Sequence, residues 1–231
     1  MVQIEFFHDA ICSFCFPMSA RMRKIAEKYD NIEISHRSFA LGWTEDDFIG
    51  MFGSREAVKP EVLQHWKHAN QNDDQHRFNI EGMREQDFLF PLSRPALLAA
   101  KAAGIVGGET MYWDVFDRIQ HKLFVENKNV EDFIVLKEAV LETSVSYEDW
   151  EKQFQKKETE EKVLEDIAKA RSYGVVSVPT LVVNGKYKIS GARTIQELEQ
   201  ILQNIAKEEQ LNLFAEGSNT CQMNNGKWEC N

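Results

Sequence analysis

Two cysteines separated by two residues, Cys12 and Cys15, are the residues of this chain best suited to chemistry. They follow an apolar segment, residues 2–7, and they open a segment that we expect to be helical from about Cys12 to Tyr29. The N-terminus of a helix presents unpaired N–H groups and the positive end of the helix dipole, which together stabilise a thiolate. Because the thiolate is the nucleophile of disulfide exchange, the pattern predicts a thiol–disulfide site.

Cysteines spaced in this way also fit half of a zinc site, with Cys221 and Cys230 supplying the other half. Zinc ligands usually occur in pairs two to four residues apart, whereas eight residues lie between Cys221 and Cys230. Redox chemistry therefore explains the pattern better, and we predict no metal. Three histidines, His65, His68 and His76, also suggest a metal, but polar histidines on a surface helix explain them more simply.

The tail carries the second cysteine pair, Cys221 and Cys230. Three interpretations remain open: a structural disulfide, an auxiliary redox pair that exchanges with Cys12–Cys15, or free thiols and metal ligands. A purely structural disulfide is unusual in a reducing cytosol, which keeps the auxiliary pair among the alternatives.

Composition limits the classes of function. The chain has 231 residues, of which 43% are hydrophobic, so it can form a sizeable core. Its net charge of −10, without a Lys/Arg-rich block, argues against a nucleic-acid partner. No apolar run is long enough for a membrane span, and the first residues lack the basic and apolar regions of a signal peptide. We therefore expect a cytoplasmic protein with no membrane association and no cofactor beyond its own cysteines; oligomeric state is not indicated.

The elements that must position the cysteines have the order βαβ, helical block, ββα. We expect strands on either side of the first helix, over residues 2–7 and 32–39. A hairpin is expected later in the chain, with strands over residues 175–183 and 186–190 and a tight turn at Asn184-Gly185. Thr194 should cap a last amphipathic helix. We predict an α/β sheet formed by residues 1–42 and 174–210, an inserted all-helical domain over residues 43–173, and a cysteine-bearing tail over residues 211–231.

This arrangement resembles the thioredoxin fold, and the helical insertion is similar to that of the DsbA family of thiol–disulfide oxidoreductases. Two short motifs resemble its FrnE-like subgroup: Phe39-Ala40-Leu41-Gly42 after the second strand and Ser190-Gly191-Ala192-Arg193 before the last helix. The dipeptide Ser13-Phe14 differs from the Pro-His and Pro-Trp found in the family, so the resemblance leaves the redox potential open.

The resemblance implies a role for each matching residue. Cys12 corresponds to the attacking cysteine and Cys15 to the resolving one. Pro179 corresponds to the cis-proline of the family, a catalytic position. The residues expected to bind substrate are Ser13, Phe14, Val178 and Thr180.

The resolving cysteine needs a proton acceptor when it attacks. Glu5 is one candidate, because Glu5-Phe6-Phe7 resembles the first strand of DsbA proteins with their buried acid. Asp9, which is nearer to the cysteines in sequence, is the other candidate.

We expect a protein disulfide oxidoreductase whose substrates are protein thiols and disulfides or a small thiol such as glutathione. A glutathione-dependent isomerase of the 2-hydroxychromene-2-carboxylate type resembles the same architecture, but such enzymes usually have serine in place of this cysteine pair. A peptide-binding module without redox activity is a third alternative.

Overall fold

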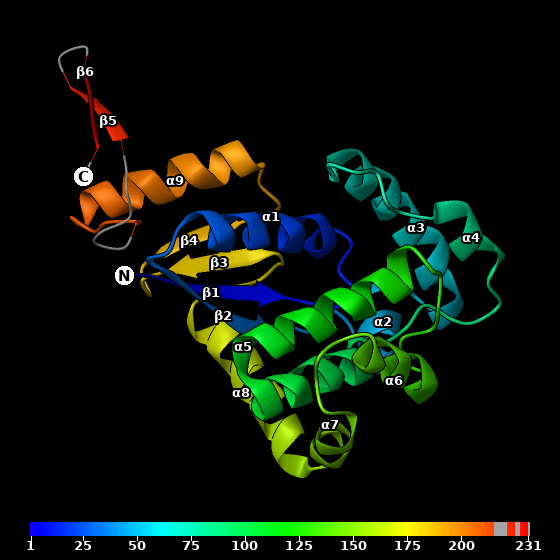
Figure 1. Cartoon of the computed structure of the whole chain (residues 1–231). Helices are drawn as coiled ribbons and strands as arrows, with labels where there is room; N and C mark the ends of the chain where they lie inside the picture. The colour runs from blue at the N-terminus through cyan, green and yellow to red at the C-terminus, as the bar shows by residue number, and fades with distance from the viewer. Residues whose placement is uncertain (215–220, 225–226, 231) are drawn as a thin grey trace.

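The fold is built around a four-stranded sheet. The computed structural model describes residues 1–214, 221–224 and 227–230, the last two segments by their backbone. The sheet order is β2-β1-β3-β4, from β1 (Val2–His8), β2 (Ile32–Ser38), β3 (Thr180–Val183) and β4 (Tyr187–Ser190). The prediction that the βαβ and ββα segments contribute their strands to one sheet, with helices inserted between them in the chain, is confirmed (Figure 1).

Strand pairing brings distant segments to one end of the sheet. β1 pairs in parallel with β2 and antiparallel with β3, and Phe7 lies opposite Thr180. The loop that follows β1 therefore meets the residues that precede β3. The β3–β4 connection is the predicted tight turn: Asn184 and Gly185 both have positive φ, 51° and 65°, as a type I′ hairpin requires.

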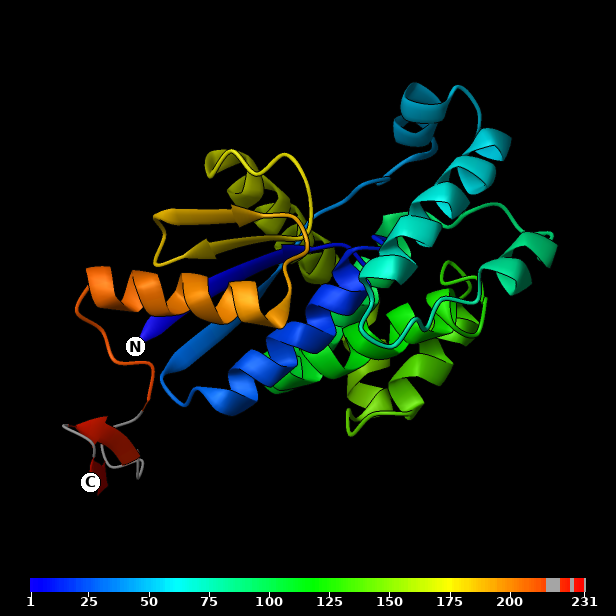
Figure 2. The ribbon, with the colours of Figure 1, turned by 90° about the horizontal axis from the view of Figure 1, so that it is seen from above.

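Helices cover both faces of the sheet. α1 (Cys15–Lys28) and α9 (Ile195–Glu208) pack on the face that carries Ile4 and Phe6 (Figure 2). α8 (Lys157–Ser172) lies on the opposite face, where Ala170 contacts the side of the sheet that carries Phe7. The predicted cap of α9 is present, because Thr194 and Glu197 form a capping box.

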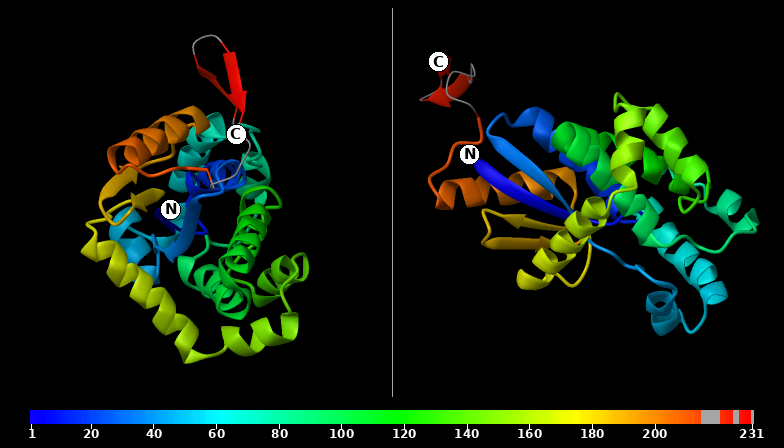
Figure 3. Two further views of the ribbon diagram at one scale, coloured as in Figure 1. Left: turned by 60° about the vertical axis from the view of Figure 1, so that its left-hand side comes forward. Right: turned by 90° about the horizontal axis from the view of Figure 1, so that it is seen from below.

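All the regular elements between β2 and β3 are helices. In chain order these are α2 (Glu45–Phe52), α3 (Arg55–Asn72), α4 (Ile80–Glu85), α5 (Ser93–Phe124), α6 (Phe133–Leu141), α7 (Tyr147–Phe154) and then α8. The sequence predicts five or six helices in this block, whereas the structure has seven: α2 and α4 are additional, and the two segments predicted on either side of Gly107-Gly108 form the single helix α5. Figure 3 shows the block beside the sheet and, at its far end, α2 and α3. α8 lies within residues 43–173 yet packs on the sheet, and the domain boundaries stay a prediction.

Two helices differ from their predicted limits. The sequence predicts a short helix over residues 62–70, after Pro60, but α3 begins at Arg55, where the Ser54 side chain accepts a hydrogen bond from the Ala57 N–H. Pro60 removes one backbone hydrogen bond within the helix, and buried Val58 and Leu63 on either side keep the segment packed. The sequence predicts that one helix ends at Gly104 and that another begins after Gly107-Gly108, but α5 continues through all three glycines and is kinked at Gly108, whose φ of 79° is not helical.

The chain returns to the edge of the sheet after α9. The Asn31 N–H donates to the Leu213 carbonyl, and Phe214 packs against Tyr29. Beyond it, β5 (Cys221–Asn224) and β6 (Lys227–Cys230) form an antiparallel pair of their own. Within the described ranges, no helix is both long and apolar enough to cross a bilayer.

Candidate active site

The loop after β1 holds Cys12 in a hydrogen-bonded turn. The Asp9 carboxylate accepts from the Ile11 N–H at 3.1 Å, and the Asp9 carbonyl accepts from the Cys12 N–H at 3.1 Å. α1 therefore begins at Cys15, three residues later than predicted, because residues 9–12 satisfy their polar groups within the turn. Cys12 precedes the helix, and the Cys15 N–H donates to its carbonyl at 3.0 Å.

Cys12 faces the segment that precedes β3. Its thiol Sγ lies 3.5 Å from the Val178 carbonyl oxygen, a sulfur hydrogen bond between residues 166 positions apart. The Val178–Pro179 peptide bond is cis. Thr180, next along the chain, donates from its hydroxyl to the Ser177 carbonyl at 2.8 Å, which ties the two sides of this loop together. The structure thus brings together Cys12, Val178 and Pro179.

Cys15 differs from Cys12 in its surroundings. Both are free thiols; Cys12 retains 6% of its surface and Cys15 none. Burial raises the pKa of the Cys15 thiol well above its ordinary value, and the neighbouring Cys12 and the negative charge of Asp9 raise it further. Cys12 is therefore the cysteine that a substrate can reach, and Cys15 needs a base to become a thiolate.

The Asp9 carboxyl group is fully buried among neutral donors. The Ser93 hydroxyl and the Leu41 N–H each donate to Asp9 Oδ2 at 2.6 Å. Burial raises the Asp9 pKa to about 6, although these hydrogen bonds partly oppose the effect. A carboxyl group with such a pKa is mostly ionised at neutral pH and can accept a proton.

Glu5 occupies the opposite kind of environment. Its carboxylate accepts from Arg37 Nε at 2.8 Å and forms an ion pair with Lys169 of α8. Burial acts to raise the Glu5 pKa, but the hydrogen bonds from Lys169, Tyr173 and Arg37 outweigh it and lower the pKa below its ordinary value. Glu5 and Asp9 are four positions apart along β1 and its end, about 13 Å at 3.3 Å per residue. The structure therefore does not bring the two candidate bases together.

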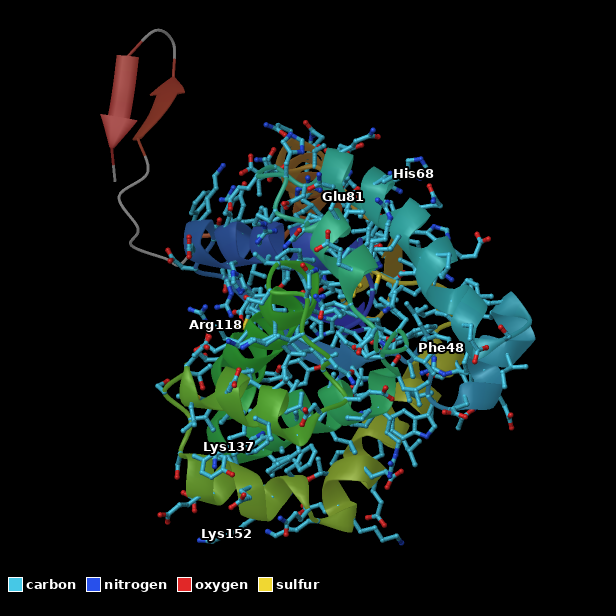
Figure 4. The ribbon with its side chains drawn as sticks, turned by 90° about the vertical axis from the view of Figure 1, so that its right-hand side faces the viewer. Phe48, His68, Glu81, Arg118, Lys137 and Lys152 are labelled. Carbon is cyan, nitrogen blue, oxygen red and sulfur yellow. The ribbon has the colours of Figure 1, made fainter. Side chains whose placement is uncertain are left out.

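An apolar groove opens beside Cys12. It has a volume of about 260 Å³, and its walls include Ser13 and Phe14 from the cysteine loop and Val178 from the loop before β3. The other walls come from the segment after β2 and from α2, α3 and Phe90. Figure 4 marks Phe48, where α2 meets the body of the molecule. Of the residues predicted to bind substrate, Ser13, Phe14 and Val178 line this groove.

Some predicted candidates lie elsewhere. Among the described residues, no group of three or more His, Cys, Asp or Glu side chains is placed to hold a metal ion. His65 lines the groove, whereas His68 lies exposed on the outer side of α3 (Figure 4). The side chains of Cys221 and Cys230 fall outside the described part of the chain; their backbone positions lie directly opposite each other in the β5–β6 pair.

Sequence reasoning missed the two partners that hold Asp9. Ser93-Arg94-Pro95 predicts only the start of a helix, and Leu41 stands out in the sequence only as part of a motif. Ser93 also exchanges hydrogen bonds with Gly42, which accepts from the Ser93 N–H at 2.8 Å and donates to its hydroxyl at 3.1 Å. No local pattern could have identified Ser93, which is 84 positions from Asp9.

Comparison with known proteins identifies a family. The model of the DSBA-like thioredoxin domain matches residues 3–203, nearly the whole chain. No curated protein matches the sequence.

Several solved structures have a similar fold. A proposed protein disulfide isomerase from Nitrosomonas europaea is 18% identical, with a TM-score of 0.72 over 90% of this chain and 98% of its own. The cytosolic disulfide reductase DsbM from Pseudomonas aeruginosa, solved with glutathione, is 14% identical, with a TM-score of 0.70 over 90% of this chain and 100% of its own. A 2-hydroxychromene-2-carboxylate isomerase is 14% identical, with a TM-score of 0.63 over 90% and 98% of the two chains. At these identities the likeness concerns the fold.

Proposed function

The chain belongs to the family of DSBA-like thioredoxin domains, a family of thiol–disulfide oxidoreductases and isomerases, and we propose that it exchanges disulfides with its substrates through Cys12 and Cys15. The observation that carries the proposal is the placement of Cys12. Its thiol is the more accessible of the pair and lies 3.5 Å from the Val178 carbonyl, next to an apolar groove. The 2-hydroxychromene-2-carboxylate isomerase activity and a non-redox peptide module remain the alternatives.

Reduction of a substrate begins at Cys12. Its thiolate attacks one sulfur of the substrate disulfide, so that the Cys12–substrate bond forms while the substrate S–S bond breaks. The released sulfur leaves as a thiolate and takes up a proton. Ser13, Phe14, Val178 and Pro179 would form the surface against which the substrate backbone lies. Thr180, which was also expected to bind substrate, is buried and instead holds the loop before β3 through its hydrogen bond to Ser177.

The second step uses Cys15 and a base. Cys15 loses its proton and attacks Cys12, so that the Cys12–Cys15 disulfide forms and the second substrate sulfur is released. We propose that Asp9, rather than Glu5, accepts the proton of Cys15. Asp9 is buried next to the cysteine turn, and its negative charge contributes to the raised pKa of the Cys15 thiol. Oxidation of a substrate dithiol is the reverse sequence.

The physiological setting is part of the proposal. We propose a cytosolic enzyme that acts on protein disulfides or on a small thiol, supported by the fold that it shares with a cytosolic disulfide reductase solved with glutathione. The FrnE-like motifs around Leu41 and Gly191 support the same placement.

The tail cysteines form an auxiliary redox pair in this proposal. Cys221 and Cys230 are register partners on antiparallel strands, a position at which Cα atoms lie about 4.5–5.5 Å apart, within the range of a disulfide. Their oxidation to a disulfide would reduce a Cys12–Cys15 disulfide to two thiols, which conserves electrons and protons. Replacing both with Ser and measuring the rate at which the Cys12–Cys15 disulfide is reduced tests this exchange, and an unchanged rate contradicts it.

Insulin reduction tests the proposed function as a whole. Cys12→Ser should abolish the activity, and Cys15→Ser should accumulate a mixed disulfide between Cys12 and the substrate, detectable by mass. Activity that survives Cys12→Ser contradicts the proposal. Isomerase activity on a 2-hydroxychromene-2-carboxylate that is independent of Cys15 supports the first alternative.

A further inference from the structure

Ser93 joins three segments that are distant in the sequence. It is the first residue of α5, it is buried, and its hydroxyl donates to Asp9 Oδ2 at 2.6 Å. The same oxygen accepts from the Gly42 N–H at 3.1 Å, while the Ser93 N–H donates to the Gly42 carbonyl at 2.8 Å. One side chain therefore ties the loop after β1 to the segment after β2 and to the start of α5.

Helix α5 does not use this hydroxyl for its own cap. Serine at a helix start often accepts a hydrogen bond from the first turn, but the cap position here is Leu92, which forms no side-chain cap. The Ser93 hydroxyl points to Asp9 instead. Its proton and its acceptor capacity are thus committed to the cysteine loop and to Gly42.

The donors to Asp9 differ in kind. The Leu41 N–H donates to Oδ2 at 2.6 Å and the Ile11 N–H to Oδ1 at 3.1 Å, and both are backbone groups. Of the donors that the structure describes at this carboxylate, Ser93 is the one that comes from a side chain. Hydrogen bonds to the charged form of a carboxyl group favour that form, so Ser93 favours ionised Asp9.

The surroundings of Asp9 make this hydrogen bond important. Among the side chains that the structure describes, no cation pairs with Asp9, so neutral donors oppose the effect of burial, and Ser93 contributes the largest opposing effect. The titratable groups around Asp9 are Cys12, Cys15, His8 and Tyr112. None of them is a cation at neutral pH, because burial lowers the pKa of His8 well below its ordinary value.

We propose that Ser93 is a positioning residue for the resolving step, and that its hydroxyl keeps Asp9 ionised and fixed beside the cysteine turn. The inference rests on the proposed function, in which Asp9 accepts the Cys15 proton. In that step the proton passes from Cys15 to Asp9, the Cys12–Cys15 bond forms, and the substrate sulfur leaves with the electron pair of the bond that breaks. No bond changes at Ser93 itself, which acts through Asp9.

The pH dependence of substrate release tests this role. Ser93→Ala removes the hydroxyl, and the pH at which release from the Cys12 mixed disulfide is half-maximal should rise by about one unit, from about 6 to about 7. The rate should fall about fivefold at pH 6 and less than about twofold at pH 8.5, where Asp9 is ionised in both proteins. Ser93→Thr keeps the hydroxyl and should restore the wild-type midpoint. Rapid mixing followed by acid quenching measures each rate.

Ser19 provides a matched control. Its hydroxyl is also buried, donates to Asp117 at 2.6 Å and accepts from Trp113 Nε1 at 2.7 Å. Ser19→Ala therefore removes a similar hydrogen bond from a different carboxylate, one that pairs with Arg23, and should leave the midpoint near pH 6. Thermal unfolding shows which variants are folded at the assay temperature. If Ser93→Ala is not, Ser93→Cys, whose thiol is a weaker donor, takes its place and should shift the midpoint in the same direction.

A second measurement follows Asp9 without turnover. The carboxyl carbon of Asp9, assigned by its absence in Asp9→Asn, is titrated by NMR in the reduced protein. An upward shift in Ser93→Ala but not in Ser19→Ala supports the inference. An unchanged Asp9 titration, or a loss of rate that is the same at every pH, overturns it and leaves the proposed function intact. Absence of any Cys12 mixed disulfide in Cys15→Ser overturns the proposed function, and the inference with it.

Discussion

Two carboxylates near β1, Glu5 and Asp9, show how surroundings divide the same chemical group into different roles. Glu5 lies in the middle of the strand and pairs with the cations Arg37 and Lys169. Asp9 lies just beyond the strand and is held by the neutral donors Ser93 and Leu41. Hydrogen bonds from Lys169, Tyr173 and Arg37, two of them cations, hold the pKa of Glu5 below its ordinary value against the effect of burial, whereas burial among neutral groups raises that of Asp9 to about 6.

From this difference we infer that Glu5 contributes to stability and that Asp9 takes part in proton transfer. A carboxylate stabilised by cations has little tendency to take up a proton near neutral pH. A carboxylate whose pKa lies near the working pH takes up and releases a proton readily. We therefore expect Asp9 substitutions to change rates and their pH dependence, and Glu5 substitutions to change mainly the stability.

The largest expected effect is that of Asp9→Asn on the second half of the reaction. Without the carboxylate, loss of the Cys15 proton should slow, and the release of substrate from the Cys12 mixed disulfide should fall about 100-fold. Rapid mixing followed by acid quenching measures this step. Glu5→Gln is the matched control and should change the rate by less than about threefold. Equal losses in the two variants would remove the distinction between the carboxylates.

The pH dependence of the same step should separate them further. Below about pH 6 Asp9 becomes protonated, so the wild-type rate should fall about tenfold for each unit of pH. Glu5→Gln should keep this profile, and Asp9→Asn should lose it. A wild-type rate that stays constant between pH 7 and about pH 5 would exclude Asp9 as the proton acceptor.

Stability should show the cost of burying Asp9. Its pKa is 3.8 ordinarily and about 6 in the folded chain, a difference worth about 3 kcal/mol. Because the pKa is raised on folding, a protonated Asp9 favours the folded state over the unfolded one by this amount relative to an ionised Asp9. This contribution to the free energy of unfolding is fully present below pH 3.8 and is lost as the pH rises through about 6. Urea unfolding of wild type and Asp9→Asn across this range gives the difference between the two free energies of unfolding. It should change by about 3 kcal/mol, in favour of the variant as pH rises; a constant difference contradicts the assignment.

The smallest expected effect belongs to Glu5→Gln. Loss of its ion pairs, which involve the half-exposed Lys169, should cost at most about 1 kcal/mol at neutral pH. Since the Glu5 pKa is lowered on folding, this contribution is present above its ordinary value of 4.5 and is lost as the pH falls further. Unfolding at pH 7 and at pH 3 measures it. A larger cost at the lower pH would reverse the predicted sign.

The sequence by itself determined the features that depend on neighbours along the chain. The spacing of Cys12 and Cys15 marked them as the candidate reactive pair, the residues Asn184-Gly185 identified the tight turn, and Thr194 identified the cap of α9. Each signal works because turn geometry and helix capping involve groups within a few residues of one another. The order of strands and helices followed from the same local patterns and was sufficient to predict the sheet.

Only the tertiary structure decided the environment of each side chain. Asp9 and Glu5 are both acidic residues near β1, and nothing local distinguishes a buried acid from an ion-paired one. The distinction comes from Ser93 and Leu41, which lie 84 and 32 positions from Asp9, and from Lys169, which lies on α8. The groove likewise requires α2 to pack beside the cysteine loop. Burial, desolvation and charge pairing depend on residues that only the folded chain brings together, and these determine which carboxylate can accept a proton.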